Sequence, residues 1–194
     1  MSSAFLPGFC QPQAEAKLPA MPPPEEIKRG FVVRVNTERV TLPNGTVIDI
    51  DVVPHPGAAA VVPFLSDDEV LLIRQYRHAT GGTILEVPAG KLEPGEAPER
   101  CAARELEEEA GRQAGRIERL GWIWTTPGFT DERIFLFAAF DLEAVPPRLE
   151  ADELIEPVRV PLAEALDLVW RGEISDAKSA LALLHAAQRL GRLR

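Results

Sequence analysis

Apolar residues occur in short runs from Ala58 onward, separated by turn residues and by three stretches of helical character. Apolar runs of roughly four to eight residues bounded by Gly, Pro, Asp or Asn are typical of strands. Such strands are predicted at 58–65, 70–73, 84–87, 120–124, 134–140 and 158–160. Helices are predicted at 98–110, 163–170 and 176–190, and Gly111 and Gly172 follow the first two. This order predicts an α+β fold in which helices pack on the faces of a mixed sheet.

The N-terminal part of the chain has a different composition. Residues 1–26 are rich in Pro, Ala and Gln, which favours an extended and weakly packed tail. Further strands are predicted at 31–35, 40–42 and 46–50. Asn44-Gly45 indicates a hairpin between the last two, because both residues tolerate positive φ. A sheet this small is not stable alone, so residues 27–56 are expected to pack on the main domain, 57–194, or on a partner subunit.

The chain of 194 residues has a formal net charge of −9. Acidic proteins repel the phosphate backbone, so we expect no nucleic-acid partner. A polyanionic substrate would need cations between itself and the carboxylates, and divalent metal ions are the simplest source. The two cysteines, Cys10 and Cys101, form no disulfide framework. Because there is no membrane-length apolar run and no secretory signal, we expect a cytoplasmic protein with no membrane partner.

Acidic side chains gather on one face of the helix predicted at 98–110. Glu105 and Glu109 are four positions apart and Glu108 lies between them, so the three carboxylates are neighbours. Like charges at this spacing each cost about 0.2–0.5 kcal/mol, and a divalent cation removes that penalty. Magnesium prefers hard oxygen ligands, usually one or two carboxylates with water and phosphate oxygens. The alternative is a solvated acidic helix face, which is the usual role of such a sequence.

The loop that precedes this helix carries a second signal. Gly90 and Gly95 permit unusual dihedral angles, and Pro94 stiffens the chain between them. Arg104 stands eight positions after Glu96, and an ion pair between them would pin the loop to the helix. Because loop glycines, an Arg-Glu doublet and spaced carboxylates occur together, a metal site is favoured over a solvated face.

The stretch from Gly90 to Gly111 resembles the Nudix box. That pattern is Gly, five residues, Glu, seven residues, Arg-Glu, an apolar residue, any residue, Glu-Glu, any residue, Gly and an apolar residue. The matching residues are Gly90, Glu96, Arg104, Glu105, Leu106, Glu108, Glu109 and Gly111. The last position departs from the pattern, because Arg112 stands where an apolar residue is usual. This departure affects local packing more than chemistry.

The resemblance implies a Nudix fold, in which a mixed β-sheet is sandwiched between helices, here with a small N-terminal antiparallel sheet. It implies that Glu105, Glu109 and Glu108 bind Mg2+, with the backbone carbonyl of Ala89 as a further ligand. Mn2+ and Zn2+ are alternative metals. Glu108 and Arg104 are candidate catalytic residues on the same basis. The implied reaction is attack by water on a phosphorus atom of a nucleoside diphosphate linked to another group.

Segments outside the box are similar to the ADP-ribose pyrophosphatase branch of this family. They are 74–77, 85–90, 126–132 and 172–178. Pro127 fits a proline associated with that branch, and the similarity runs from about Phe31 to Leu184. In this branch the N-terminal sheet exchanges between two subunits, and each active site borrows residues from its partner. The resemblance therefore implies a homodimer.

Four residues are candidates for binding the substrate. Arg77 follows a strand and precedes the loop, so it can reach a diphosphate as a bidentate donor. Glu132 can accept hydrogen bonds from ribose hydroxyls, and Glu86 belongs to the similar stretch before the box. Phe31 is the candidate for stacking on the adenine. The alternatives are a surface arginine for Arg77, an ordinary loop carboxylate for Glu132 and a core position for Phe31.

The general base is expected outside the box, because the box carboxylates are used on metal. In the ADP-ribose branch a glutamate from a later loop serves, and here that loop is 150–156. It precedes a strand and can fold over the site as a lid. Glu153 best matches the family position, Glu150 is the second candidate, and a solvated acidic loop is the alternative. The histidines lie outside the box, so histidine catalysis is not expected.

The sequence leaves three functions open. The first is Mg2+-dependent hydrolysis of the pyrophosphate bond of ADP-ribose to AMP and ribose 5-phosphate, or of another nucleoside diphosphate sugar such as GDP-mannose or ADP-glucose. The second is a binding module that has lost catalysis, although such modules usually lose box carboxylates and this chain keeps them. The third is an enzyme for nucleoside triphosphates or dinucleoside polyphosphates, which the segment around Pro127 disfavours.

Overall fold

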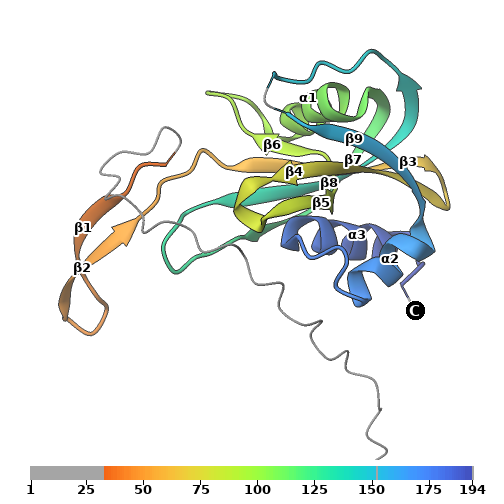
Figure 1. The fold of residues 1–194 in the computed structure, drawn as a ribbon. Helices are drawn as coiled ribbons and strands as arrows, with labels where there is room; N and C mark the ends of the chain where they lie inside the picture. Colours follow the sequence, from red (N-terminus) through yellow and green to blue (C-terminus); the bar gives the residue numbers. More distant parts are fainter. Residues whose placement is uncertain (1–32, 152, 194) are drawn as a thin grey trace, which may run out of the picture.

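A computed structural model describes residues 33–151 and 153–193. The predicted tail, 1–26, and Phe31 lie outside the described residues. Along the chain, the elements are β1 Asn36–Thr41, β2 Val47–Val52, β3 Ala58–Ser66, β4 Glu69–Arg77, the 3-10 helix η1 His78–Thr80, β5 Gly82–Glu86, β6 Ala89–Lys91, α1 Pro98–Ala110, β7 Arg112–Trp124, β8 Arg133–Ala144, β9 Ile155–Pro161, α2 Leu162–Trp170 and α3 Ala177–Arg189 (Figure 1).

The main sheet is mixed and has the strand order β5-β4-β3-β8-β7, with β6 paired to β3 and β9 paired to β4. The central strand β3 runs parallel to β8 and antiparallel to β4 and β6. Its sequence AAAVVPF is buried throughout, as expected for a strand that is covered on both faces. The predicted α+β architecture, with a mixed sheet between helices and a small antiparallel sheet, is confirmed.

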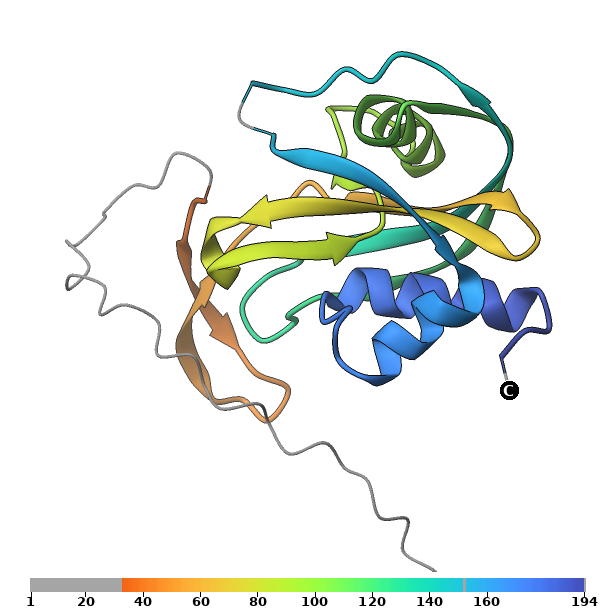
Figure 2. The same ribbon diagram turned by 45° about the vertical axis from the view of Figure 1, so that its right-hand side comes forward.

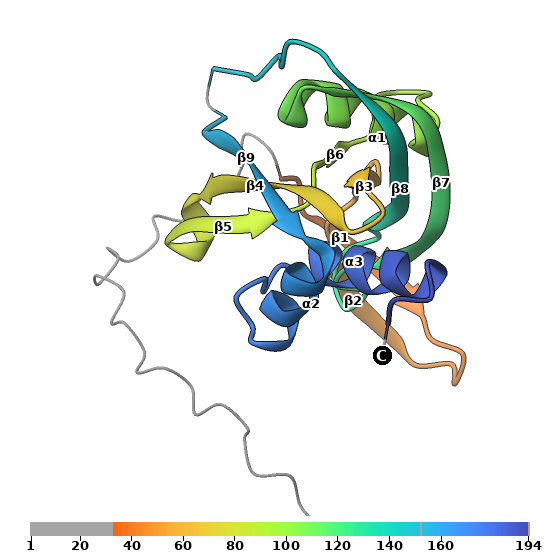
Figure 3. The same cartoon turned by 90° about the vertical axis from the view of Figure 1, so that its right-hand side faces the viewer.

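Helices cover both faces of this sheet, with α1 on one side and α2 and α3 on the other (Figure 3). Because side chains alternate along a strand, β3 contributes to both cores. Ala60 and Val62 pack with the residues under α2 and α3. Ala59 and Val61 pack with Cys101 and other residues of α1. The helix that carries the acidic motif is therefore held on the sheet through its apolar side.

The hairpin of β1 and β2 stands apart from the main sheet (Figure 2). Its turn follows the Asn-Gly prediction, since Gly45 has a φ of +84° and the Asn44 side chain accepts from Thr46 N at 3.0 Å. The strand predicted at 31–35 is wrong over its described part, because residues 33–35 are not in a strand. Val53 joins the hairpin to the main domain by bridging to Thr130.

Several strands are longer than predicted, and β7 and β6 depart most from the prediction. β7 begins at Arg112 rather than near 120, because its first half pairs with β8 and packs Ala114 and Ile117 on the α1 side. The short β6 was expected to be loop, and it pairs with β3 through Ala89, Gly90 and Lys91. No helix within 33–151 and 153–193 has the length and apolar character needed to cross a bilayer.

Candidate active site

The helix α1 spans the predicted residues, begins with Pro98 at its first turn and ends at Gly111. Gly111 has a φ of +60° and its N–H bonds to carbonyls of the last turn, which is a left-handed C-cap. Leu106 is fully buried on the sheet side, and Glu105 and Glu109 follow on the adjoining face with 8% and 3% exposure. Because the apolar side of α1 packs on the sheet, the carboxylates of Glu105 and Glu109 are buried beneath the loop at Ala89 and Gly90.

The loop at Ala89 and Gly90 lies directly against these carboxylates. Ala89 N donates to Glu109 Oε2 at 2.8 Å. A Cβ built on Gly90 would overlap the carboxylate of Glu105, so a larger residue there would have to displace this side chain or the loop. Strand β6 thus brings its backbone onto the acidic face of α1, which places the predicted metal ligands Ala89, Glu105 and Glu109 together.

Arg104 links the loop to the helix, as the sequence predicted. Its Nε and Nη2 each lie 3.0 Å from an oxygen of Glu96, and Nη2 also donates to the Lys91 carbonyl at 3.0 Å. Its Nη1 donates to Glu105 at 2.7 Å and to Glu108 at 3.0 Å. All three nitrogens are engaged by acceptors of the protein, so this arginine positions the box rather than reaching a ligand.

Burial and mutual repulsion shape the electrostatics of the acidic face. Desolvation, together with the charges of Glu105 and Glu153, raises the pKa of Glu109 to about 8, against the hydrogen bond from Ala89 N. Desolvation also raises the pKa of Glu105, against the opposing charge of Arg104. By contrast, the hydrogen bonds from Arg104 lower the pKa of Glu96 to about 2. Burial therefore disfavours the charged forms of Glu105 and Glu109, and a nearby cation would stabilise them.

The three box carboxylates do not converge in this structure. Within the described residues, no three His, Cys, Asp or Glu side chains are arranged closely enough to enclose a metal ion. Glu108 is 29% exposed and faces Arg104 and Arg148, whose Nη2 lies 3.6 Å from it. Arg112, the departure from the box pattern, begins β7, and its buried Nε has no partner in the described part of the chain.

Basic side chains form a second group beside the loop. Arg77 donates to both oxygens of Glu86, from Nε and from Nη2, each at 2.9 Å. Lys178 Nζ donates to Glu86 Oε2 at 2.8 Å and to Asp176 at 2.9 Å. The hydrogen bond to Glu86 raises the pKa of Arg77, so the guanidinium stays charged. The Glu86 side chain is only 2% exposed, so it acts as the buried anchor of two cations.

A cavity of about 590 Å³ lies between this group, the loop and the ends of β7 and β8. Ala89, Gly90, Arg77 and Glu132 all line it. Glu105 and Glu109 do not line it themselves and lie behind Ala89 and Gly90. Its other polar lining residues are His55, Lys91, Thr125, Thr126, Asp176 and Lys178. The cavity therefore extends from the loop in front of the acidic box to Arg77 and Lys178.

Glu132 is fixed on the far wall of the cavity. Thr125 Oγ1 donates to its Oε2 at 2.7 Å, and His55 Nε2 lies 3.4 Å from its Oε1. Sequence reasoning did not select His55 or Lys178 as site residues. His55 precedes β3 and Lys178 opens α3, so no local pattern joins them to the box. The similarity of residues 172–178 to the ADP-ribose branch was the one signal for Lys178.

The connection from β8 to β9 passes over α1 and includes the first part of the lid loop predicted at 150–156 (Figure 2). Residues 155 and 156 of the predicted loop belong to β9. Arg148 N donates to the Glu108 carbonyl at 3.0 Å, which holds the loop on the end of α1. Glu153 Oε2 accepts from Glu150 N at 2.8 Å, and its charge acts on Glu105 and Glu109. Of the two candidate bases, Glu153 is partly buried and Glu150 is exposed.

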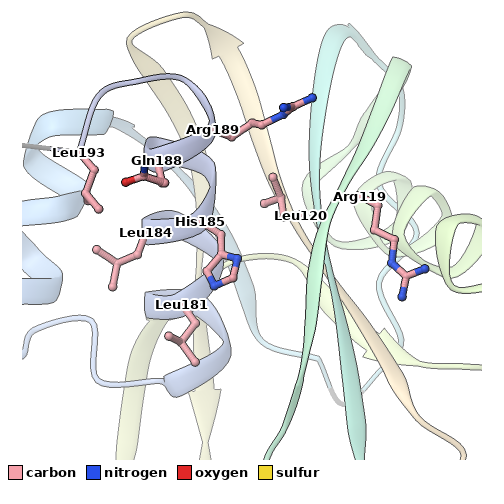
Figure 4. A pocket seen from close by; sticks show the side chains of 8 residues that line it. All are labelled: Arg119, Leu120, Leu181, Leu184, His185, Gln188, Arg189 and Leu193. Carbon is pink, nitrogen blue, oxygen red and sulfur yellow. The ribbon is translucent and has the colours of Figure 1, made fainter.

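A second cavity of about 590 Å³ lies between β7 and α3 (Figure 4). Leu181, Leu184, His185 and Gln188 of α3 line it, and the guanidinium of Arg119 points away from α3. No carboxylate lines this cavity among the described residues. It shares only Leu181 with the first cavity and lacks the donor set for a metal, so the first cavity is the candidate active site.

Comparisons with known proteins agree with this geometry. The family model described as the NUDIX domain matches residues 54–182. The ADP-ribose pyrophosphatase of Bacillus subtilis is 41% identical over 161 residues, which cover 82% of this chain and 87% of the relative. The GDP-mannose pyrophosphatase of Enterobacter is 33% identical, with 79% and 86% of the two chains covered.

A solved structure supports the same assignment. The crystal structure of an ADP compounds hydrolase superposes with a TM-score of 0.76 at 27% sequence identity, covering 85% of this chain and 91% of the other. The shared fold and the matched box together decide the family. The chain belongs to the Nudix family and is a Nudix pyrophosphatase.

Proposed function

We propose that the protein hydrolyses the pyrophosphate bond of ADP-ribose, yielding AMP and ribose 5-phosphate. The observation that carries this proposal is the cavity that joins the loop over Glu105 and Glu109 to the guanidinium of Arg77. A diphosphate needs both a cation-binding acidic group and fixed positive donors. The relatives named ADP-ribose pyrophosphatase support this choice of substrate.

Divalent metal ions belong to this function, because Nudix hydrolases generally use them. The donors that would hold the metal are Glu105, Glu109 and Glu108 with the Ala89 carbonyl, and Mg2+ suits such oxygen ligands best. The fit is supported by Glu109, which is 3% exposed and whose carboxylate, among the described residues, accepts a hydrogen bond only from Ala89 N. Mn2+ and Zn2+ are the alternatives. Bound metal would supply charge neutralisation at the phosphoryl oxygens and would acidify the attacking water.

The protein's own residues supply the remaining steps of the proposed mechanism. Arg77 binds and orients the diphosphate, while Glu132 accepts hydrogen bonds from ribose hydroxyls. Glu153 accepts the proton of the attacking water, from a lid that limits access of bulk water. Arg104 keeps Glu105 and Glu108 in place and takes no part in proton transfer. Phe31, outside the described residues, remains the proposed partner of the adenine.

A homodimer completes the proposal. Several large apolar side chains on and beside the hairpin are exposed, which is unusual for a surface without a partner. They are Val33, Val35, Val47, Ile50 and Phe129. An exchanged N-terminal sheet would cover them and bring the partner's residues to each site. Light scattering after gel filtration tests this, and a monomer at micromolar concentration would contradict it.

Other substrates and a non-catalytic role stay open as alternatives. GDP-mannose is favoured among them by the relatives that carry its name, and ADP-glucose shares the same diphosphate. A binding module without catalysis is disfavoured, since the box carboxylates and the Glu96–Arg104 pair are intact.

A substrate panel separates these functions. The protein is incubated with Mg2+ and with ADP-ribose, GDP-mannose, ADP-glucose or NADH, and released mononucleotide is measured. We expect AMP from ADP-ribose at the highest kcat/KM and no release after treatment with EDTA. A higher kcat/KM for GDP-mannose would reassign the substrate, and no release from any compound would support the binding module.

A further inference from the structure

Two cations share the buried carboxylate that holds Arg77. Glu86 Oε2 accepts from Arg77 Nη2 at 2.9 Å and from Lys178 Nζ at 2.8 Å, while Oε1 accepts from Arg77 Nε at 2.9 Å. Lys178 reaches this carboxylate from α3, 92 positions along the chain, and its side chain is 14% exposed. A carboxylate on β5 thus ties the end of β4 to the start of α3.

Asp176 fixes the other end of this set of contacts. It caps α3 by accepting from Ser179 N at 3.0 Å, and it accepts from Lys178 Nζ at 2.9 Å. The Ser179 hydroxyl oxygen in turn accepts from Val87 N at 2.9 Å. Because Val87 directly follows Glu86 and leads into the loop, Lys178 is held between two anchored carboxylates and has little freedom to move.

The contacts with Glu86 determine which nitrogen of Arg77 can reach a ligand. Arg77 Nε and Nη2 donate to Glu86, whereas Nη1 has no hydrogen bond among residues 33–151 and 153–193 and can meet a ligand. The Arg77 side chain is 40% exposed and lines the cavity. The direction of Nη1 follows the plane of the Glu86 carboxylate. We propose that Lys178 is a positioning residue that fixes this plane and so aims Arg77 at the diphosphate of the substrate. The inference rests on the proposed function for the identity of that ligand.

The charge balance around Arg77 also supports a role for Lys178 in binding the diphosphate. Arg77 and Lys178 balance Glu86 and Asp176, so the group is neutral as a whole. Loss of the Lys178 ammonium leaves one excess negative charge beside a cavity that must accept a polyanion. Loss of Lys178 should therefore weaken diphosphate binding more than it lowers kcat.

The first test is the kinetics of Lys178→Met. We expect KM for ADP-ribose to rise about tenfold while kcat changes less than about threefold, which marks a binding defect. Lys178→Arg should recover most of the affinity, because a guanidinium can also bond two carboxylates. Lys91→Met is the matched comparison, since Lys91 lines the same cavity and has no ion pair among the described residues. Equal KM increases for both methionine variants would mean a general loss of charge and would overturn the positioning role.

The second test asks whether the effect passes through Arg77. Lys178→Met is combined with Arg77→Gln, and the binding of ADP in Mg2+ is measured by calorimetry for all four proteins. We expect Lys178→Met to weaken ADP binding about tenfold in the wild type and less than about twofold in the Arg77→Gln background. Additive losses would show that Lys178 acts independently of Arg77 and would overturn the inference.

This binding test also separates the two proposals. If the wild type binds ADP but hydrolyses no sugar nucleotide, the proposed function fails while the coupling of Lys178 to Arg77 can still be measured. Circular dichroism melts accompany every variant, and Lys178→Gln, which also removes the positive charge, carries the test if the methionine variant does not fold.

Discussion

Gly90 lies so close to the carboxylate of Glu105 that a single methyl group between them would overlap it. The glycine belongs to β6 and the glutamate to α1, so this contact presses the loop backbone onto the acidic face of the helix. The first residue of the Nudix box is therefore required for close packing, since its φ is not positive and no turn demands a glycine there.

Substitution of Gly90 tests this contact directly. Gly90→Ala must displace either the loop or the Glu105 side chain, so we expect kcat/KM to fall by about 100-fold or more. Gly82→Ala is the matched control, because a Cβ at Gly82 meets nothing within 4 Å. Similar activity in both alanine variants would show that the close approach has no catalytic role.

Glu109 is the residue whose loss should separate metal binding from folding. Its carboxylate is 3% exposed and has no cationic partner in the described part of the chain, so its charge is costly without metal. We expect Glu109→Gln to melt at the same or a higher temperature in EDTA and to lose most of the increase that Mg2+ gives the wild type. That increase should be roughly 5–10 °C at a hundredfold excess over Kd.

Glu107→Gln provides the control for this experiment, because Glu107 lies on the same helix but faces Arg148 at 3.4 Å. It should keep the full Mg2+ shift. A Mg2+ shift that survives in Glu109→Gln would remove Glu109 from the metal ligands.

The pH dependence of stability should report the Glu96–Arg104 pair. The pKa of Glu96 is about 2 in the folded protein, below its ordinary value of 4.5, because Arg104 donates to both of its oxygens. A lowered pKa stabilises the fold above about pH 4.5, and this contribution is lost as the pH falls towards 2. We expect Glu96→Gln to lose about 1–2 kcal/mol of unfolding free energy at pH 7.

Urea unfolding at several pH values checks this expectation. The difference between wild type and Glu96→Gln should shrink below pH 4.5. A difference that stays constant down to pH 3 would mean that the ionised pair is not its source.

Proton transfer is tested on the lid loop. We expect Glu153→Gln to lower kcat for ADP-ribose by about 100-fold with little change in KM. Glu150→Gln should retain turnover, because Glu150 supports Glu153 through its backbone N–H and not its side chain. The opposite result, with turnover lost only in Glu150→Gln, would exchange the two roles.

The box region could be predicted from sequence because its signals are local. The helix limits, the left-handed Gly111 and the Glu96–Arg104 pair depend on residues within eight positions of each other or on a single dihedral angle. The carboxylates were expected to converge on a metal, whereas Glu105 and Glu108 both bond to Arg104, which neutralises them locally.

Features that depend on distant pairing escaped the prediction. The first half of β7 carries too many polar residues to read as a strand, and pairing with β8 decides its conformation. Lys178 and His55 join the cavity only through the path of α3 and the segment before β3. The strand expected at 31–35 has suitable residues, but over its described part it finds no neighbour to pair with.

Product analysis of ADP-ribose in H2(18)O tests the central claim most directly. The protein is incubated with ADP-ribose and Mg2+, the products are separated, and their masses are measured by mass spectrometry. The account predicts AMP and ribose 5-phosphate in equal amounts, with one 18O per cleavage carried by one of them, and no products from Glu109→Gln. Intact ADP-ribose after prolonged incubation, or products without 18O, would contradict it.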